Sequence, residues 1–188
     1  MKKHLIPSLI LTIIFIVICG GLYPLLVAGI SKFAPGGGKG ETLMVNGKVV
    51  GYANEGQKFT LDKYFWGRPS AVGYNAAGSG GSNKAPSDSA YLKGVEAAID
   101  TFLVHNPTVT RMDVPSDLVT ASGSGLDPDI SVQGALVQVN RVAKVRNLAP
   151  QQVLALVNSH IEKPLLGLFG PEKINVLKLN IALDELKK

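Results

Sequence analysis

The sequence is poor in the residues that usually build metal centres and covalent cross-links. It has one cysteine, Cys19, and three histidines, His4, His105 and His160. A single cysteine cannot form an intrachain disulfide, and a cysteine-based zinc site is equally impossible. The histidines are scattered, without the H-E-x-x-H spacing that places two imidazoles on one face of a helix. We therefore expect no metal site, and the chain must be stabilised by core packing.

Charge is missing from residues 5–30, a run of 26 residues with neither acidic nor basic side chains. About 20 apolar residues in a helix cross a hydrocarbon core roughly 30 Å thick. A cleaved signal peptide would have an apolar core of only about 7–15 residues. A lipoprotein signal at Cys19 would need a small residue where Ile18 stands. The run therefore predicts a permanent transmembrane helix over residues 5–30.

Positive charge is unevenly placed around this helix. Lys2 and Lys3 precede it, whereas the two lysines that follow are diluted through a glycine-rich linker over residues 31–42. Basic residues beside a membrane span tend to stay in the cytoplasm. We therefore expect a cytoplasmic N-terminus over residues 1–4, a single pass through the cell membrane, and an extracytoplasmic domain over residues 43–188.

The first half of the domain carries turn and capping signals. Asn46-Gly47 separates two short apolar runs, and this pair is typical of a β-hairpin because both central residues of the turn take positive φ. Residues 57–61 form a further candidate strand. Asp88 or Ser87 can cap a helix over residues 89–104, whose apolar side chains recur on one face.

The second half of the domain alternates between helical and extended patterns. The patterns predict a strand over residues 114–120, a helix capped by Ser131, a helix starting at Pro150, a strand over residues 174–179 and a terminal helical turn over residues 182–187. Several helices with few strands indicate an α+β fold, or an α/β fold with few strands.

Two stretches rich in glycine and serine show no periodicity. They cover residues 67–87 and 121–130. An irregular segment of about 20 residues in a compact domain is usually either functional or disordered, and loop positions carry function more often than core positions do. We therefore predict two functional or interface loops, residues 79–83 and 120–128, with the following candidate residues: Ser79, Gly80, Gly81, Ser82, Asn83, Thr120, Ser122, Gly123, Ser124, Gly125 and Asp127.

These loops lack the motifs of catalytic and nucleotide sites. The sequence has no G-K-[ST] of a P-loop, no G-x-G-x-x-G and no G-x-S-x-G nucleophile elbow. Asp127 and Asp129 do not have the spacing of a calcium loop. The basic residues Arg141, Lys144 and Arg146 have no interleaved aromatics, which predicts a solvated face and no nucleic-acid partner. We expect an accessory subunit without a cofactor of its own, not an independent enzyme.

Several blocks, read together, resemble the C subunit of Kdp-type potassium-transporting ATPases, the KdpC family. They are collinear along nearly the whole chain and comprise residues 21–25 (G-L-Y-P-L), 64–71 (Y-F-W-G-R-P-S-A), 74–75, 77–83 (A-G-S-G-G-S-N), 114–115, 117–128 (D-L-V-T-A-S-G-S-G-L-D-P), 138–143 (Q-V-N-R-V-A) and 175–183 (N-V-L-K-L-N-I-A-L). The blocks at residues 65–70 and 118–127 are the most specific of these.

The resemblance implies a membrane complex for high-affinity, ATP-driven potassium uptake. Its other members would be a channel-like A subunit, a P-type ATPase B subunit and a small F peptide, with membrane lipid around the anchor. In one role that it implies, the chain is a catalytic chaperone that raises the ATP affinity of the B subunit, with Gln138 in contact with the nucleotide. In the other, the domain stabilises the assembly as a cap on the external mouth of the A subunit.

The predicted topology favours the cap, because an external domain cannot reach cytoplasmic ATP. The resemblance also implies a histidine at position 129 in many relatives, whereas this chain has Asp129. A proton or metal role at that position is therefore not carried over. The residues taken without the resemblance leave open an independent membrane-anchored binding protein or hydrolase unrelated to transport.

Overall fold

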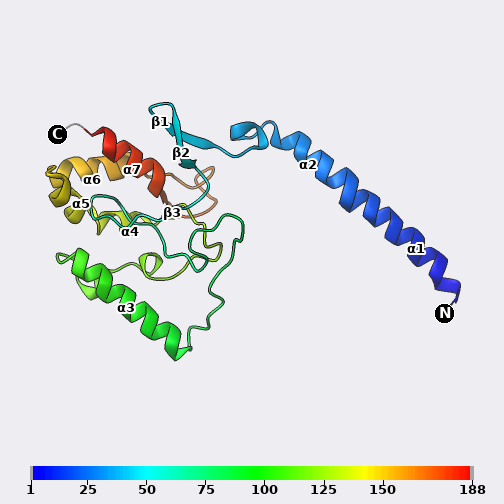
Figure 1. Ribbon diagram of the computed structural model, residues 1–188, viewed down its shortest axis with the longest axis horizontal. Coiled ribbons are helices and arrows are strands. Elements are labelled where there is room, and N and C mark those ends of the chain that lie inside the picture. The colour runs from blue at the N-terminus through cyan, green and yellow to red at the C-terminus, as the bar shows by residue number, and fades with distance from the viewer. Residues whose placement is uncertain (1, 187–188) are drawn as a thin grey trace. The chain divides into compact units, whose positions relative to one another are not determined.

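The computed structural model describes residues 2–186 and contains helices, two small sheets and one long apolar helix (Figure 1). The predicted α+β class is confirmed. The chain divides into two compact units, Met1–Thr42 and Leu43–Lys188. Met1 and residues 187–188, which fall in the predicted N-terminal segment and the predicted C-terminal turn, lie outside the described residues.

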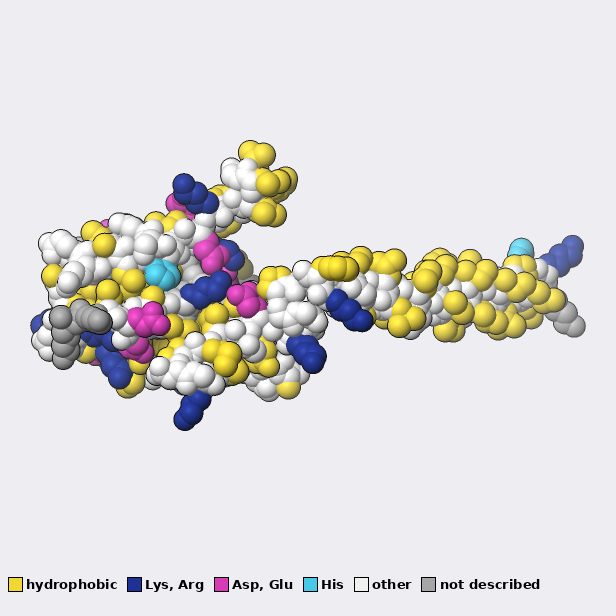
Figure 2. Space-filling view, turned by 90° about the horizontal axis from the view of Figure 1, so that it is seen from above, with side chains coloured by type: hydrophobic (Ala, Val, Ile, Leu, Met, Phe, Trp, Pro, Cys, Tyr) yellow, Lys and Arg dark blue, Asp and Glu magenta, His cyan; other side chains and the backbone are white. Residues whose placement is uncertain are grey.

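The first unit is dominated by the apolar helix. α1 (Lys2–Val17) continues through a π-helical turn, η1 (Ile18–Leu22), into α2 (Tyr23–Ser31). The 29 residues of Lys3–Ser31 are long and apolar enough to cross a membrane, and Figure 2 shows hydrophobic side chains along this helix. Pro24 accounts for the π turn. Because proline has no N–H, it cannot bond the carbonyl one turn earlier, and a wider turn accommodates this.

The second unit opens with the predicted β-hairpin. A 3₁₀ turn, η2 (Pro35–Gly38), precedes β1 (Thr42–Val45) and β2 (Lys48–Tyr52), which are paired in one sheet. Asn46 and Gly47 have φ angles of 51° and 75°. These are the left-handed conformations that the two-residue turn requires.

The predicted cap of α3 (Ser89–His105) is confirmed at Asp88. Its carboxylate accepts the backbone N–H groups of Tyr91 at 3.2 Å and Ala90 at 2.9 Å. These two hydrogen bonds lower the pKa of Asp88. Phe102 is the buried residue of α3, and in Figure 1 this helix lies apart from α4–α7.

Four helices of the C-terminal half carry most of the core. α4 (Val132–Leu136) begins at Ser131, whose hydroxyl accepts the Gly134 N–H at 2.9 Å, as predicted. α5 (Val139–Arg146), α6 (Pro150–Ser159) and α7 (Val176–Glu185) follow. Their buried side chains form one cluster with residues of the preceding loops, and its largest members include Phe65, Phe102, Val142, Val153, Val157, Ile174, Leu179 and Leu183.

Two of the predicted strands are wrong. Residues 57–61 are irregular, and Gln57 bonds its side-chain amide to the Val50 carbonyl at 3.1 Å. Residues 114–120 form a tight turn, η4 (Ser116–Leu118), after an earlier one, η3 (Arg111–Asp113). Thr120 folds back so that its N–H and its hydroxyl both bond the Ser116 carbonyl, at 3.0 and 2.6 Å.

The predicted strand over residues 174–179 is mostly helix. Only β4 (Ile174–Asn175) is extended, and it pairs antiparallel with β3 (Asp129–Ile130). Asn175 then caps α7 by accepting the Lys178 N–H at 3.0 Å. Leu179 and Leu183 are both buried and lie four residues apart, which is helical spacing.

Candidate functional site

Two side-chain amides clamp the irregular segment that follows residue 64. Asn180 of α7 accepts the Phe65 N–H at 2.8 Å and donates to the Phe65 carbonyl at 3.0 Å. Gln138, just before α5, does the same for Trp66, at 2.8 and 3.1 Å. The backbone polar groups of two consecutive residues are thus bonded by side chains, where a sheet would use a neighbouring strand. Residues 65–66 are thereby fixed between α5 and α7.

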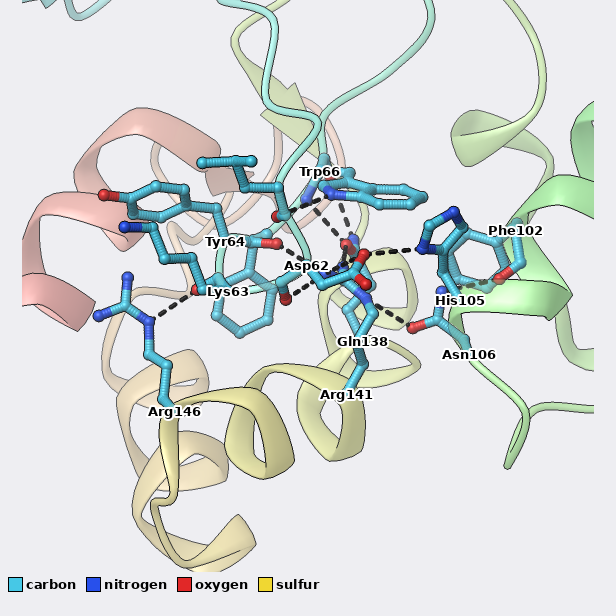
Figure 3. A network of polar contacts seen from close by, with 12 residues as sticks. Asp62, Lys63, Tyr64, Trp66, Phe102, His105, Asn106, Gln138, Arg141 and Arg146 are labelled. Carbon is cyan, nitrogen blue, oxygen red and sulfur yellow. Dashed lines mark hydrogen bonds and ion pairs between the residues drawn. The ribbon is translucent and has the colours of Figure 1, made fainter.

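Arg141 lies at the centre of a polar network beside this clamp (Figure 3). Its guanidinium donates to Gln138 at 2.6 Å, to Asn106 at 3.0 Å, and to the backbone carbonyls of Asp62 and Tyr64 at 2.5 and 3.0 Å. Its side chain is 2% exposed. The prediction of a solvated basic face is therefore wrong at this residue, although Lys144 on the same helix is exposed.

The guanidinium of Arg141 also stacks on an aromatic ring. Its central carbon lies 4.5 Å from the centroid of Trp66, and the same ring also neighbours the imidazole of His105 at 4.9 Å and the ring of Phe102 at 6.4 Å. Burial lowers the pKa of Arg141 to about 10, against the opposing effect of the Asp62 carboxylate. The side chain therefore stays cationic at neutral pH, and hydrogen bonds with a cation–π contact offset its desolvation.

A second arginine of α5 extends the network to α7. Arg146 donates to the Lys63 carbonyl at 2.6 Å and to Asp184 at 2.6 Å, and lies 5.0 Å from the ring centroid of Tyr64. Burial, with a hydrogen bond to Asp184, raises the pKa of Tyr64. The backbone of residues 62–66 is therefore held by side chains from two helices.

The two predicted functional loops lie against each other. The Gly80 N–H and the Ser79 hydroxyl both donate to the Ser124 carbonyl, each at 2.9 Å. The backbone also approaches closely at Gly81, where a Cβ would lie 3.1 Å from the Gly123 carbonyl oxygen. We call residues 67–83 and 120–128 the paired loops. A side chain at Gly81 would crowd the Gly123 backbone, which explains the glycine at this position.

Residues at the start of the first loop hold the second one in place. Ser70 donates to the Gly125 carbonyl at 2.6 Å and accepts the Tyr74 N–H at 2.8 Å. The Tyr74 hydroxyl donates to the Arg68 carbonyl at 2.5 Å, and burial raises the pKa of this phenol. The Arg68 guanidinium in turn pairs with Asp127 at 3.0 Å. These contacts connect the clamp at residues 65–66 to the paired loops.

A polar pocket of about 550 Å³ lies beside the paired loops. Arg68 and Asp127 line it, together with Asp117, Asp129 and Lys173. Lys173 bonds Asp129 at 2.6 Å, and this hydrogen bond raises the pKa of the ammonium group. The charged groups of the pocket are thus largely paired with one another, Arg68 with Asp127 and Lys173 with Asp129.

The candidate residues differ in how far the paired loops bury them. Ser122 and Gly125 are buried and hold the loop from inside, whereas Ser79, Ser82, Asn83, Gly123 and Ser124 are exposed. Within residues 2–186, no group of three or more His, Cys, Asp or Glu is placed to hold a metal ion. The arrangement fixes the shape of a glycine- and serine-rich surface.

Gln138 is buried with 0% of its surface exposed. Besides the clamp and the bond from Arg141, its amide donates to the Gly134 carbonyl at 2.9 Å. Nucleotide contact through Gln138 stays a prediction, and it would require this amide to leave its partners.

The sequence did not predict Asn180 and Arg68 as site residues. Asn180 falls in the block 175–183 and Arg68 in the block 64–71, and both blocks carry the family resemblance.

The family model described as "KdpC: K⁺-transporting ATPase, c chain" matches residues 5–185. The chain belongs to the KdpC family. A relative named "Potassium-transporting ATPase KdpC subunit" from Flavobacterium psychrophilum is 57% identical over 185 residues, which covers 98% of this chain and 100% of the relative. The proteins of the same name from Bacteroides fragilis and from a Janthinobacterium species are 54% and 44% identical, each over 98% of this chain and over 98% and 100% of their own lengths.

The residues that resemble the KdpC family can be compared with the residues that form the contacts described above. The family match includes the apolar helix as well as the domain. Four of the resembling blocks, residues 64–71, 117–128, 138–143 and 175–183, supply the clamp, Arg141 with its partner Gln138, and about half of the paired loops. The specific part of the sequence is therefore the part that fixes loop shape.

Proposed function

We propose that the chain is a non-catalytic accessory subunit of an ATP-driven potassium uptake complex, tethered by its N-terminal helix, and that its domain stabilises the assembly as a cap. The observation that carries this proposal is the KdpC family match over residues 5–185, which spans both the anchor and the domain. The partners are a channel-like A subunit, a P-type ATPase B subunit and a small F peptide. Lipid surrounds the anchor.

The construction of the paired loops supports a binding role for this surface. Their exposed parts are small residues such as Gly123 and Ser124, while buried Ser122 and Gly125 and the ion pair of Arg68 with Asp127 set their shape. A surface that is ordered before binding loses less conformational entropy when a partner docks. We therefore assign the contact with the A subunit to the exposed faces of residues 79–83 and 123–124.

The environment of Gln138 favours the cap over the catalytic chaperone. An amide that already bonds Trp66, Gly134 and Arg141 has little capacity left for a nucleotide. Releasing it would leave the Trp66 N–H and carbonyl unpaired in a partly buried place, at a cost of up to about 1–3 kcal/mol for each group. The chaperone is the second candidate, and it is supported only by the family resemblance.

Co-purification tests the proposed function. The tagged full chain, solubilised in mild detergent, should retain a P-type ATPase subunit and a larger channel-like subunit in stable proportion. With the Gln138→Leu substitution, less of the chain should be found in the complex, because the domain is less stable. The complex that still assembles should have an unchanged KM for ATP. A chain that purifies alone excludes the subunit role. Full assembly with a raised KM for ATP would favour the chaperone.

The orientation of the domain is tested by cysteine labelling. The only native cysteine, Cys19, lies inside the apolar helix, so Cys19→Ser gives a background without thiols. The basic N-terminus is expected to stay in the cytoplasm, which places the domain outside the cell. In the Met112→Cys variant the new thiol should therefore react with a membrane-impermeant maleimide in intact cells, since Met112 is 94% exposed. Labelling only after the membrane is opened would place the domain in the cytoplasm and exclude an external cap.

A further inference from the structure

An apolar hairpin projects from the domain between α6 and β4, at residues 162–173. At its base, Glu162 and Lys173 exchange backbone hydrogen bonds of 2.8 and 3.2 Å. Near its tip, Leu165 pairs with Phe169, and the turn between them is closed by the Gly167 N–H on the Pro164 carbonyl at 2.9 Å. We call residues 162–173 the apolar hairpin. It is an ordered element, held by its own backbone bonds.

The tip of the apolar hairpin presents a cluster of large hydrophobic side chains to the outside. Four such side chains fall within five residues and remain mostly exposed: Leu165 at 71%, Leu166 at 81%, Leu168 at 81% and Phe169 at 64%. Figure 2 shows a protruding group of hydrophobic side chains with charged ones where it joins the domain. Single exposed apolar residues are ordinary, but contiguous groups mark interaction surfaces.

The backbone of the tip adds a second indication. Leu166 has a φ of +55°, followed by Gly167 at +72°. The left-handed region is unfavourable for a side chain such as leucine and is normally occupied by glycine or asparagine. This position therefore combines a strained backbone with an exposed apolar side chain. Such strain is often found at binding positions, so the tip is a candidate for contact with a partner.

The charges at the base of the hairpin distinguish between lipid and protein as that partner. Glu162, Lys163, Glu172 and Lys173 sum to zero. A segment that binds an anionic membrane surface carries a cluster of basic residues, and none is concentrated here. A neutral, preformed turn with large apolar side chains instead suits an apolar recess in a protein, where shape complementarity determines the fit.

The base of the apolar hairpin also borders the polar pocket. Pro171, Glu172 and Lys173 line that pocket together with Arg68 and Asp129. The hairpin and the rim of the pocket are therefore adjacent and can act as one continuous surface.

We propose that the apolar hairpin docks into an apolar recess on another protein subunit of the potassium-transporting ATPase, with the pocket rim as the polar edge of that interface. This inference rests on the proposed function, because it requires a complex. The anchor limits where the recess is: residues 32–41 span at most about 35 Å when fully extended. The start of the domain therefore stays within that distance of the apolar helix, which limits the partner to subunits that reach the domain there.

Site-specific photocrosslinking in the assembled complex tests the docking. Benzoylphenylalanine placed at Leu168 should crosslink, on irradiation, to a subunit identified by mass spectrometry as part of the same ATPase. The same probe at Met112, which is 94% exposed, provides a surface control and should give much less of that product. A product with lipid only, with a protein outside the ATPase, or no product at all would overturn the proposal.

Substitution of the tip provides the second measurement. Leu166→Asp with Leu168→Asp should reduce co-purification of the other subunits about tenfold or more, because an apolar anchor in a recess becomes charged. The midpoint of thermal unfolding of the detergent-solubilised full chain should stay the same or rise, since the side chains at positions 166 and 168 are exposed. Val104→Asp with Met112→Asp, at 78% and 94% exposure, is the matched control and should co-purify normally.

The two proposals fail in different ways. If the unsubstituted chain brings no ATPase subunit with it, the proposed function is wrong. If the unsubstituted chain assembles and the Leu166→Asp, Leu168→Asp variant assembles equally well, only the docking of the apolar hairpin is wrong.

Discussion

Replacing Arg141 by methionine should destabilise the domain by about 3–5 kcal/mol, because several buried or partly buried acceptors lose their donor at about 1–3 kcal/mol each. The methionine fills a similar volume but leaves Gln138, Asn106 and two backbone carbonyls without their donor. Unfolding of the full chain by urea in detergent measures the effect. Trp66 is the only tryptophan and lies against the guanidinium, so its fluorescence reports directly on the network.

Lys144→Met on the same helix is the matched control. Lys144 is exposed, and a surface substitution of this kind usually changes stability by less than about 0.5 kcal/mol. Arg141→Lys should recover only part of the loss, because an ammonium cannot reproduce the planar fork that reaches four acceptors. Equal stability of the Arg141→Met and Lys144→Met variants would show that the network contributes nothing net.

Gly125→Ala should disorder the paired loops and cost about 2–5 kcal/mol, from a strained left-handed backbone and from overpacking together. Gly125 has a φ of +68°, and a Cβ there would lie 2.5 Å from Val72 Cγ2 and 2.7 Å from the Gly80 carbonyl oxygen. We expect lower stability in urea and weaker co-purification of the other subunits, because the exposed loop faces lose their shape.

Gly123→Ala gives the comparison within the same loop. A Cβ at Gly123 meets no atom within 4 Å, so stability should change little. If the alanine substitutions at Gly125 and Gly123 had the same effect, close packing of the two loops would not be what maintains them.

Features that depend on neighbouring residues were predictable from the sequence. The Asn46-Gly47 turn, the Asp88 and Ser131 caps and the apolar helix each follow from a few adjacent residues, and the structure has all of them. The paired loops were also predicted as important segments. Their contact with each other was not predicted, because the bonds between Ser79 or Gly80 and Ser124 join residues about 45 positions apart.

Features that depend on distant partners could not be predicted. Arg141 was expected in solvent because basic residues mostly are, yet its acceptors at Asp62 and Tyr64 lie 79 and 77 residues away. Apolar and polar side chains alternate, although weakly, over residues 174–179, and this alternation suggests a strand. The deciding feature is the Asn175 side chain, which caps α7. This bond is local, but the alternation of apolar residues used for the strand prediction does not reveal it.

The clamped segment has a consequence for solubility. Extended backbone with free N–H and C=O groups is a template on which other chains can add a strand and aggregate. At residues 65–66 those groups are already occupied by Asn180 and Gln138. A side-chain amide satisfies the backbone as a neighbouring strand would, but it presents no further edge to a third chain. Residues 65–66 are therefore closed to strand pairing with another chain.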